Sequence, residues 1–208
     1  MLRMGHNEKF LLLGMLILNL LICSCSKNCK SYMVPSDFKQ YFFYPEGSWW
    51  VYKNQSGVYD TLTLKNVEVV MDKVQAESCD KYERISNTYK STQSGEMTAI
   101  SYHSSGDVFF FCFYQLDKSF FNDMVSFPIL ANNSHRIFAC AGEVEWSIID
   151  SVVSGNNTYH DVYQNQSFNI PQSTDTVPVT CYFVKNIGLI KKVMKNGEIW
   201  ELVNYNVR

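Results

Sequence analysis

Residues 179–205 constrain the fold most, because two stretches of alternating apolar and polar residues flank the dipeptide Asn196-Gly197. Asn-Gly between alternating stretches is the strongest short-range signal for a β-hairpin. With a two-residue loop, the two strands would place complementary side chains opposite one another. The expected pairs are Lys195 with Glu198, Lys192 with Glu201, Val193 with Trp200, Ile190 with Val203, and Gly188 with Tyr205 as an aromatic ring over a glycine. The tail therefore predicts an antiparallel hairpin in this register.

The rest of the chain also has the two-residue period of β-strands. Expected strands lie at residues 48–53, 59–65 with an extension over 67–70, 81–92, 97–103, 108–114, 145–153 and 159–163. Residues 109–113 are apolar at every position, which is typical of a strand buried on both faces. Turn-forming residues at 54–57 and 104–107 separate neighbouring strands.

Helical character is limited to one short segment. Pro35-Ser36-Asp37 predicts a helical turn that runs to Tyr41, with Ser36 or Asp37 as its N-cap. We find no sustained helical period and no internal repeat. We therefore predict an all-β protein with a single antiparallel β domain, folded as a curved sheet or open barrel. A two-sheet β-sandwich is the alternative.

The N-terminus has the pattern of a bacterial lipoprotein signal peptide. Basic residues precede an apolar stretch over 10–22, which is short for a membrane span of about 20 residues. An aliphatic residue, Ile22, and a small residue, Ser24, then stand three positions and one position before Cys25. This pattern resembles a lipobox, so we expect cleavage after Ser24 and lipidation of Cys25. Cys23 is the poorer acceptor because the bulky Ile22 precedes it.

A lipidated cysteine would tie the protein to a membrane. Each buried CH₂ of an acyl chain contributes about 0.8 kcal/mol, so an anchor with several chains, palmitate among them, gives stable attachment. An uncleaved transmembrane helix and a soluble secreted protein are the alternatives. We divide the chain into a signal peptide (1–24), a tether (25–35) and a β domain (36–208). The net charge of −2 does not favour a nucleic-acid partner.

The cysteines are consistent with export. Once Cys25 is acylated, an odd number remains in the mature chain: Cys29, Cys79, Cys112, Cys140 and Cys181. Export permits disulfides, and one bond among the last four is compatible with the sequence, which does not choose the pair. Their spacings match no CxxC metal motif. The aromatic neighbours of Cys112 and Cys181 indicate buried apolar side chains.

No motif for catalysis or cofactor binding is found. The sequence has no GxSxG elbow, glycine-rich phosphate loop or EF-hand pattern. The weaker candidates are His103, His135 and His160, the neighbours Cys140 and His135, and the carboxylates Glu143 and Glu145 on one strand face. For each of them, a solvated surface position is the simpler interpretation. We therefore expect no catalytic, cofactor-binding or metal-binding residue, and an envelope hydrolase is the alternative.

Two consecutive tryptophans are the better candidates for ligand contacts. Trp49 and Trp50 lie in one expected strand, so their side chains must point to opposite faces. One is expected in the core. The other either needs a cover, which residues 41–44 could supply, or forms an exposed aromatic platform for a glycan.

Several patches together resemble a known group of proteins. They are Gly47-Ser48-Trp49-Trp50-Val51-Tyr52, Tyr159-His160-Asp161-Val162-Tyr163, and Tyr182-Phe183-Val184-Lys185-Asn186-Ile187-Gly188-Leu189-Ile190-Lys191 followed by Trp200-Glu201-Leu202-Val203-Asn204-Tyr205. Their order is similar to that in small uncharacterised outer-membrane lipoproteins of Bacteroidota, whereas residues 71–145 match none of their motifs. The resemblance implies an all-β domain at the outer membrane, facing either the periplasm or the cell surface, and implies no catalytic residue.

These observations favour a lipid-anchored, non-enzymatic binding or accessory module of the cell envelope. Its partner would be an apolar ligand or an envelope protein, and a glycan is the alternative. A cavity lined by Trp200 and Leu202 would indicate an apolar ligand. An exposed Trp49 or Trp50 in a groove would indicate a glycan, and the absence of both features would favour a protein partner.

Overall fold

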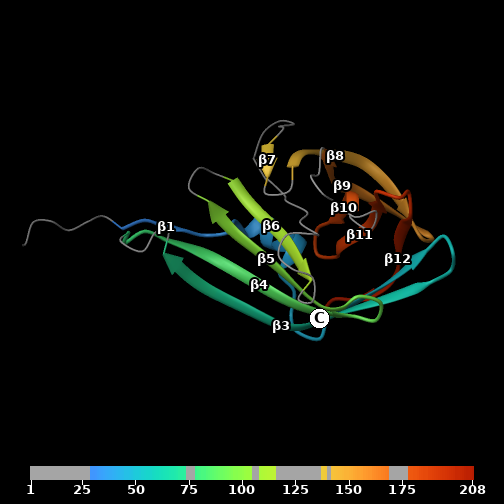
Figure 1. The fold of residues 1–208 in the computed structure, drawn as a ribbon, viewed down its shortest axis with the longest axis horizontal. Coiled ribbons are helices and arrows are strands. Elements are labelled where there is room, and N and C mark those ends of the chain that lie inside the picture. The colour runs from blue at the N-terminus through green and yellow to red at the C-terminus, as the bar shows by residue number, and fades with distance from the viewer. Residues whose placement is uncertain (1–28, 74–77, 105–107, 116–136, 140–141, 169–177) are drawn as a thin grey trace, which may run out of the picture.

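The chain folds around one curved β-sheet. The computed structural model describes residues 29–73, 78–104, 108–115, 137–139, 142–168 and 178–208. Within these ranges, twelve strands belong to a single sheet that is not closed into a barrel, and one short helix accompanies them (Figure 1). This architecture confirms the predicted all-β curved sheet, and the described strands do not form the alternative two-sheet sandwich.

The sheet order differs from the chain order at one important position. In chain order the elements are β1 (Ser31–Tyr32), α2 (Ser36–Phe42), β2 (Trp49–Asn54), β3 (Tyr59–Lys73), β4 (Lys81–Ser91), β5 (Gly95–Ser104), β6 (Val108–Gln115), β7 (Ile137–Ala139), β8 (Gly142–Ser154), β9 (Asn157–Phe168), β10 (Pro178–Val184), β11 (Gly188–Met194) and β12 (Ile199–Asn206). Across the sheet they run β6-β5-β4-β3-β2-β12-β11-β10-β9-β8-β7, and β1 pairs in parallel with the start of β4. Strand β12 therefore joins two blocks, β2–β6 and β7–β11.

Helix α2 covers the inner face of the sheet, which we define as the face that this helix contacts. The helix buries Phe38, Tyr41 and Phe42. The ring of Phe42 lies 5.3 Å from that of Phe183 on β10, and the ring of Tyr41 lies 5.8 Å from that of Tyr163 on β9. Aromatic side chains bury more area than other residues, so these contacts dominate the attachment of the helix.

The helix begins where the sequence predicts, but without the predicted cap. Pro35 occupies the N-cap position and no side chain caps the helix. Because Pro35 has extended backbone angles and its carbonyl accepts hydrogen bonds from the amides of Phe38 and Lys39, Ser36 and Asp37 fall inside the first turn. The expected helix is confirmed, and the expected Ser or Asp cap is wrong.

The tail hairpin forms, but its register differs by one residue from the prediction. The observed pairs are Lys191 with Glu201, Lys192 with Trp200, and Val193 with Ile199. The amide of Met194 donates to the carbonyl of Glu198, so the loop contains three residues, and its last residue, Gly197, has a φ of +84°. A three-residue loop with glycine in the left-handed conformation is a common hairpin connection, and the sequence Lys-Asn-Gly suits it as well as a two-residue loop.

The corrected register changes which side chains meet. The ammonium of Lys191 lies 2.8 Å from the carboxylate of Glu201, in place of the expected Lys192 pair. The aromatic residue over Gly188 is Tyr44 and not Tyr205, because a Cβ on Gly188 would lie 2.9 Å from the Tyr44 hydroxyl oxygen. Gly188 also has a φ of +97°, so this turn requires glycine for both its backbone and its close neighbour.

Candidate functional site

Trp50 is part of the core and not a ligand platform. Its side chain is 2% exposed, and its indole nitrogen donates a 2.6 Å hydrogen bond to the carbonyl of Ile187. The ring of Tyr44 meets it edge-on at 5.2 Å, and the ring of Tyr89 lies 6.0 Å away. Tyr44 belongs to the segment 41–44 that the sequence indicated as a cover. The intramolecular cover is therefore confirmed for Trp50.

Trp49 points to the opposite face and is half-buried. Its strand neighbours are Thr63 on β3 and Asn206 on β12. Neither of these neighbours is aromatic, so the ladder does not extend the Trp49 ring into a larger stacking surface. Of the two predicted ligand contacts, Trp49 alone retains an accessible ring.

A row of unlike side chains crosses the inner face beyond the helix. Trp146, Asn165, Cys181, Lys192 and Trp200 are successive cross-strand partners on β8 to β12, and we call them the inner row. Directly paired residues of antiparallel strands lie on the same face, so the row forms one continuous line. Its first three members are buried, and Lys192 and Trp200 are half-buried. The set could not be recognised in the sequence, because it exists only in the observed register.

The inner row is chemically mixed. The Lys192 ammonium lies 5.4 Å from the centre of the Trp200 ring, within the range of a cation–π interaction. At the other end, Trp146 stacks on Tyr163 with ring centres 5.7 Å apart, and its indole nitrogen has no hydrogen-bond partner among the described residues. The inner row could offer a ligand one cation and two indole rings, but most of its side chains are already packed against the protein's own side chains.

Cys181 is unsuited to nucleophilic chemistry. Burial raises the pKa of its thiol to about 12, and the nearby charge of Lys192 lowers it only in part. A nucleophilic cysteine needs a thiolate, which this environment disfavours near neutral pH. The prediction that Cys181 is a buried apolar side chain is confirmed. The side chain of Cys112 lies outside what the structure describes.

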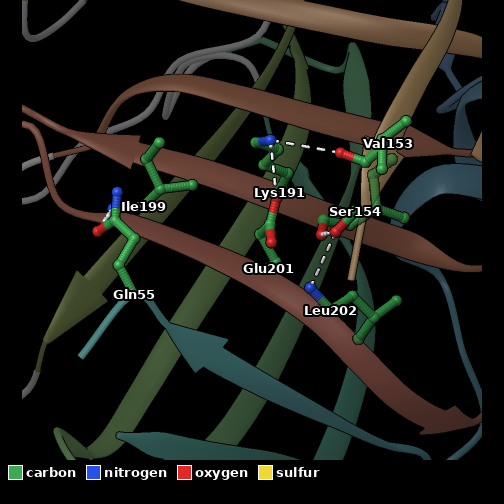
Figure 2. A network of polar contacts seen from close by, with 8 residues as sticks. Gln55, Val153, Ser154, Lys191, Ile199, Glu201 and Leu202 are labelled. Atoms are coloured by element: carbon green, nitrogen blue, oxygen red, sulfur yellow. Dashed lines mark hydrogen bonds and ion pairs between the residues drawn. The ribbon is translucent and has the colours of Figure 1, made fainter. Parts of the chain in front are cut away.

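A second polar cluster holds the end of β8 against β11 and β12 (Figure 2). The Ser154 hydroxyl donates to the carbonyl of Ile190 at 2.5 Å and accepts from the amide of Leu202 at 3.1 Å. Beside it, Lys191 donates to the carbonyl of Val153 and pairs with Glu201. We call these residues the β12 junction.

The β12 junction leaves no room beside Leu202. A Cβ on Gly155 would lie 2.8 Å from the carbonyl oxygen of Leu202, and Leu202 itself has no exposed surface. A cavity lined by Leu202 and Trp200 would have indicated an apolar ligand. The contacts instead show that Leu202 is packed under the β8–β9 turn.

The weaker catalytic candidates do not converge in the part of the chain that the structure describes. His160 and Glu145 are exposed on β9 and β8. His103 and Glu143 lie on β5 and β8, where only the backbone is described, and His135 and Cys140 lie outside the described residues. The described residues contain no group of three or more metal-ligating side chains.

The N-terminal segment is attached to β4 by a disulfide. Cys29 is bonded to Cys79, and the two Cα atoms are 5.2 Å apart. Next to this bond, Ser31 and Tyr32 pair with Lys81 and Tyr82 of β4. Residues 29–32, which lie in the expected tether, are thus bound to the sheet. The sequence left the pairing of the five remaining cysteines open, and the one bond it considered lay among Cys79, Cys112, Cys140 and Cys181, whereas the partner of Cys79 is Cys29.

An ion pair extends this attachment to the helix. The Glu83 carboxylate on β4 accepts a hydrogen bond from the amide of Val34 and lies 2.8 Å from the ammonium of Lys39 on α2. Glu83 is nearly fully buried and Lys39 is partly exposed. We call residues 29–39 the N-terminal attachment, because the disulfide, the β1 ladder and this ion pair all tie it to β4.

The remaining predicted site residue, Cys25, lies outside the described residues, as does the whole signal segment 1–24. Among the residues that are described, none belongs to a helix long and apolar enough to cross a membrane. Comparisons with protein-family models, with curated proteins and with solved structures gave no match.

Proposed function

We propose that this protein is a lipid-anchored domain of the bacterial cell envelope that acts as a non-enzymatic binding or accessory module. The observation that carries the proposal is the Cys29–Cys79 disulfide, which follows the expected lipidation site by four residues. Structural disulfides persist in oxidising compartments outside the cytoplasm. The bond and the lipobox-like sequence therefore support the same location independently.

A protein partner is the form of binding that the geometry favours. The described part of the inner face is occupied by α2 and by packed side chains such as Trp50, Cys181 and Leu202, each at most 2% exposed. This packing argues against an apolar ligand held between the tail strands. A glycan on Trp49 is the second candidate, and the half-buried ring of that residue is the observation in its favour.

The anchor can be tested by replacing Cys25 and Cys23 separately with serine in the full-length chain. Cys25→Ser should abolish palmitate labelling, and this variant should then be released from the membrane fraction. Cys23→Ser should behave as wild type. Equal labelling of the two variants would refute the assignment of Cys25.

The choice between partner classes can be tested by native mass spectrometry of the protein purified from membranes. We expect the mass of the acylated chain with no stoichiometric small molecule. A bound lipid that survives gentle desolvation would show that the domain is a carrier, and a retained oligosaccharide that is lost in Trp49→Ala would favour the glycan candidate.

A further inference from the structure

The end of the sheet beside the disulfide carries exposed apolar side chains. On β3, Val69 pairs with Ile85 and Met71 pairs with Glu83 of β4, so both lie on the inner face. Val69 is 48% exposed and Met71 is 39% exposed. Met33, just before the residue that binds Glu83, is 52% exposed. We call Met33, Val69 and Met71 the anchor-end patch.

Three lysines lie at the same end of the sheet as the anchor-end patch. Lys30, Lys73 and Lys81 are all exposed, and Lys73 is paired directly with Lys81 at the end of the β3–β4 ladder. The carboxylates at this end have partners of their own. Asp80 accepts a hydrogen bond from the backbone amide of Lys30. The Arg84 guanidinium lies 2.6 Å from the Asp72 carboxylate and 3.9 Å from the Glu68 carboxylate. The end of the sheet thus combines apolar side chains with a group of ammonium charges.

The proposed anchor is tethered to the same end of the sheet as this patch. Cys29 lies four positions after Cys25, and a chain of that length spans at most about 14 Å. Lys81 pairs with Ser31 on one side and with Lys73 on the other, so two strand spacings, roughly 10 Å, separate Ser31 from Lys73. The disulfide and the β1 ladder prevent residues 29–32 from extending the chain further.

We infer that the anchor-end patch docks on the lipid surface, so that the acyl anchor and the folded domain contact the membrane at one place. This inference rests on the proposed lipidation of Cys25. Methionine and valine side chains enter the boundary between headgroups and acyl chains, and each lysine near an anionic surface adds about 1 kcal/mol of attraction. The opposite end of β3, where Val58 and Tyr59 lie, is then held away from the bilayer by roughly 40 Å of strand.

Photoactivatable phospholipids can test this docking with the full-length lipidated protein. The protein is reconstituted in vesicles of phosphatidylethanolamine and phosphatidylglycerol that contain a phospholipid with a diazirine in its acyl chain. Trypsin then separates residues 66–73, which carry Val69 and Met71, from residues 54–65, which carry Val58 and Tyr59. We expect lipid adducts on 66–73 and none on 54–65.

Two double variants provide a matched comparison. Val69→Glu with Met71→Glu should lose most of the adducts on peptide 66–73 while keeping the palmitate and vesicle retention. Val58→Glu with Tyr59→Glu alters side chains of similar exposure, 41% and 52%, at the far end and should leave the adducts unchanged.

Each failure has a distinct signature. A wild-type protein that is retained on vesicles but carries no adduct on 66–73, or equal adducts on both peptides, would overturn the docking and leave the anchor intact. A protein without palmitate that washes off the vesicles would overturn both the anchor and the docking. Loss of a co-purifying envelope protein in the Val69 and Met71 variant, without lipid adducts in wild type, would show that the patch binds protein instead.

Discussion

The β12 junction and the N-terminal attachment both join segments that are distant in sequence, but they use different chemistry. At the junction, the Ser154 hydroxyl bonds backbone groups of Ile190 and Leu202 in a buried position. At the attachment, a disulfide and the Glu83–Lys39 ion pair connect the N-terminal segment to β4. The Ser154 hydroxyl at the first joint is buried, whereas the disulfide at the second joint begins at the exposed Cys29.

The difference follows from what surrounds each joint. Around Ser154, apolar side chains exclude water, so two hydrogen bonds and close packing are sufficient. Beside Cys29, neighbouring side chains such as Lys30 and Lys81 are exposed and charged, so less apolar burial is available there. A covalent bond replaces the missing burial. Changes of pH or of single side chains should affect the buried β12 junction and the covalent N-terminal attachment differently, and the largest expected effect comes first.

Alkaline pH should unfold the core around the junction as a whole. Burial raises the pKa of Cys181 to about 12, and it also raises the pKa values of Tyr44, Tyr52 and Tyr163 well above the ordinary phenol value. The unfolded chain ionises these groups first, so their stabilising contribution is complete below about pH 9 and is lost as the pH rises toward about 12. Near-ultraviolet circular dichroism should be lost before the phenolate absorbance reaches its full amplitude, because the buried tyrosines ionise only as the core opens. A circular dichroism signal that persists after all tyrosines have ionised would contradict the burial argument.

Leu202→Ala should cost about 2–5 kcal/mol of unfolding free energy, since it leaves a cavity in a site with no exposed surface. The adjacent Val203 is 37% exposed, so Val203→Ala should change stability by about 0.5 kcal/mol or less. Urea unfolding of the two variants measures the difference. Similar losses from both would show that the junction does not seal the core.

Cys29→Ser combined with Cys79→Ser should cost roughly 2–4 kcal/mol, because the bond closes a long loop in the unfolded chain. In contrast to Leu202→Ala, removal of the disulfide should open the N-terminal attachment while Trp50 stays buried. Hydrogen exchange of residues 30–34 compared with that of β12 gives the measurement. Exchange that increases equally in both regions would mean that the two joints are one cooperative unit.

Ser154→Ala should cost roughly 1–3 kcal/mol, because the carbonyl of Ile190 and the amide of Leu202 each lose their buried partner. Ser151→Ala on the same strand is an exposed control and should have almost no effect. Thermal unfolding of the two variants distinguishes them, and an unchanged midpoint for Ser154→Ala would show that the hydroxyl is dispensable.

Local patterns predicted the elements well because strand and turn signals are short-range. The segment 59–65 with its extension became β3, and 145–153 lies within β8. The tail register was wrong because Lys195-Asn196-Gly197 is compatible with two loop lengths. A two-residue type I′ loop needs a positive φ at both Asn196 and Gly197, and of these two residues only Gly197 has one.

The candidate site was harder to predict because its members meet only in three dimensions. The cover of Trp50 by Tyr44 was anticipated, since an aromatic segment directly precedes the strand. The inner row and the partner of Cys79 were not anticipated, because neither a cross-strand register nor a disulfide between residues 50 positions apart leaves a local signal in the sequence.

The position of β12 has a consequence for the order of folding. This strand lies between β2 and β11, although every other strand precedes it in the chain. Neither block of the sheet can gain its central neighbour before residues 199–206 have been synthesised. Contacts between such distant residues form slowly, because a long loop must close before they contribute. The chain is therefore kept from completing its native sheet until synthesis has passed residue 206.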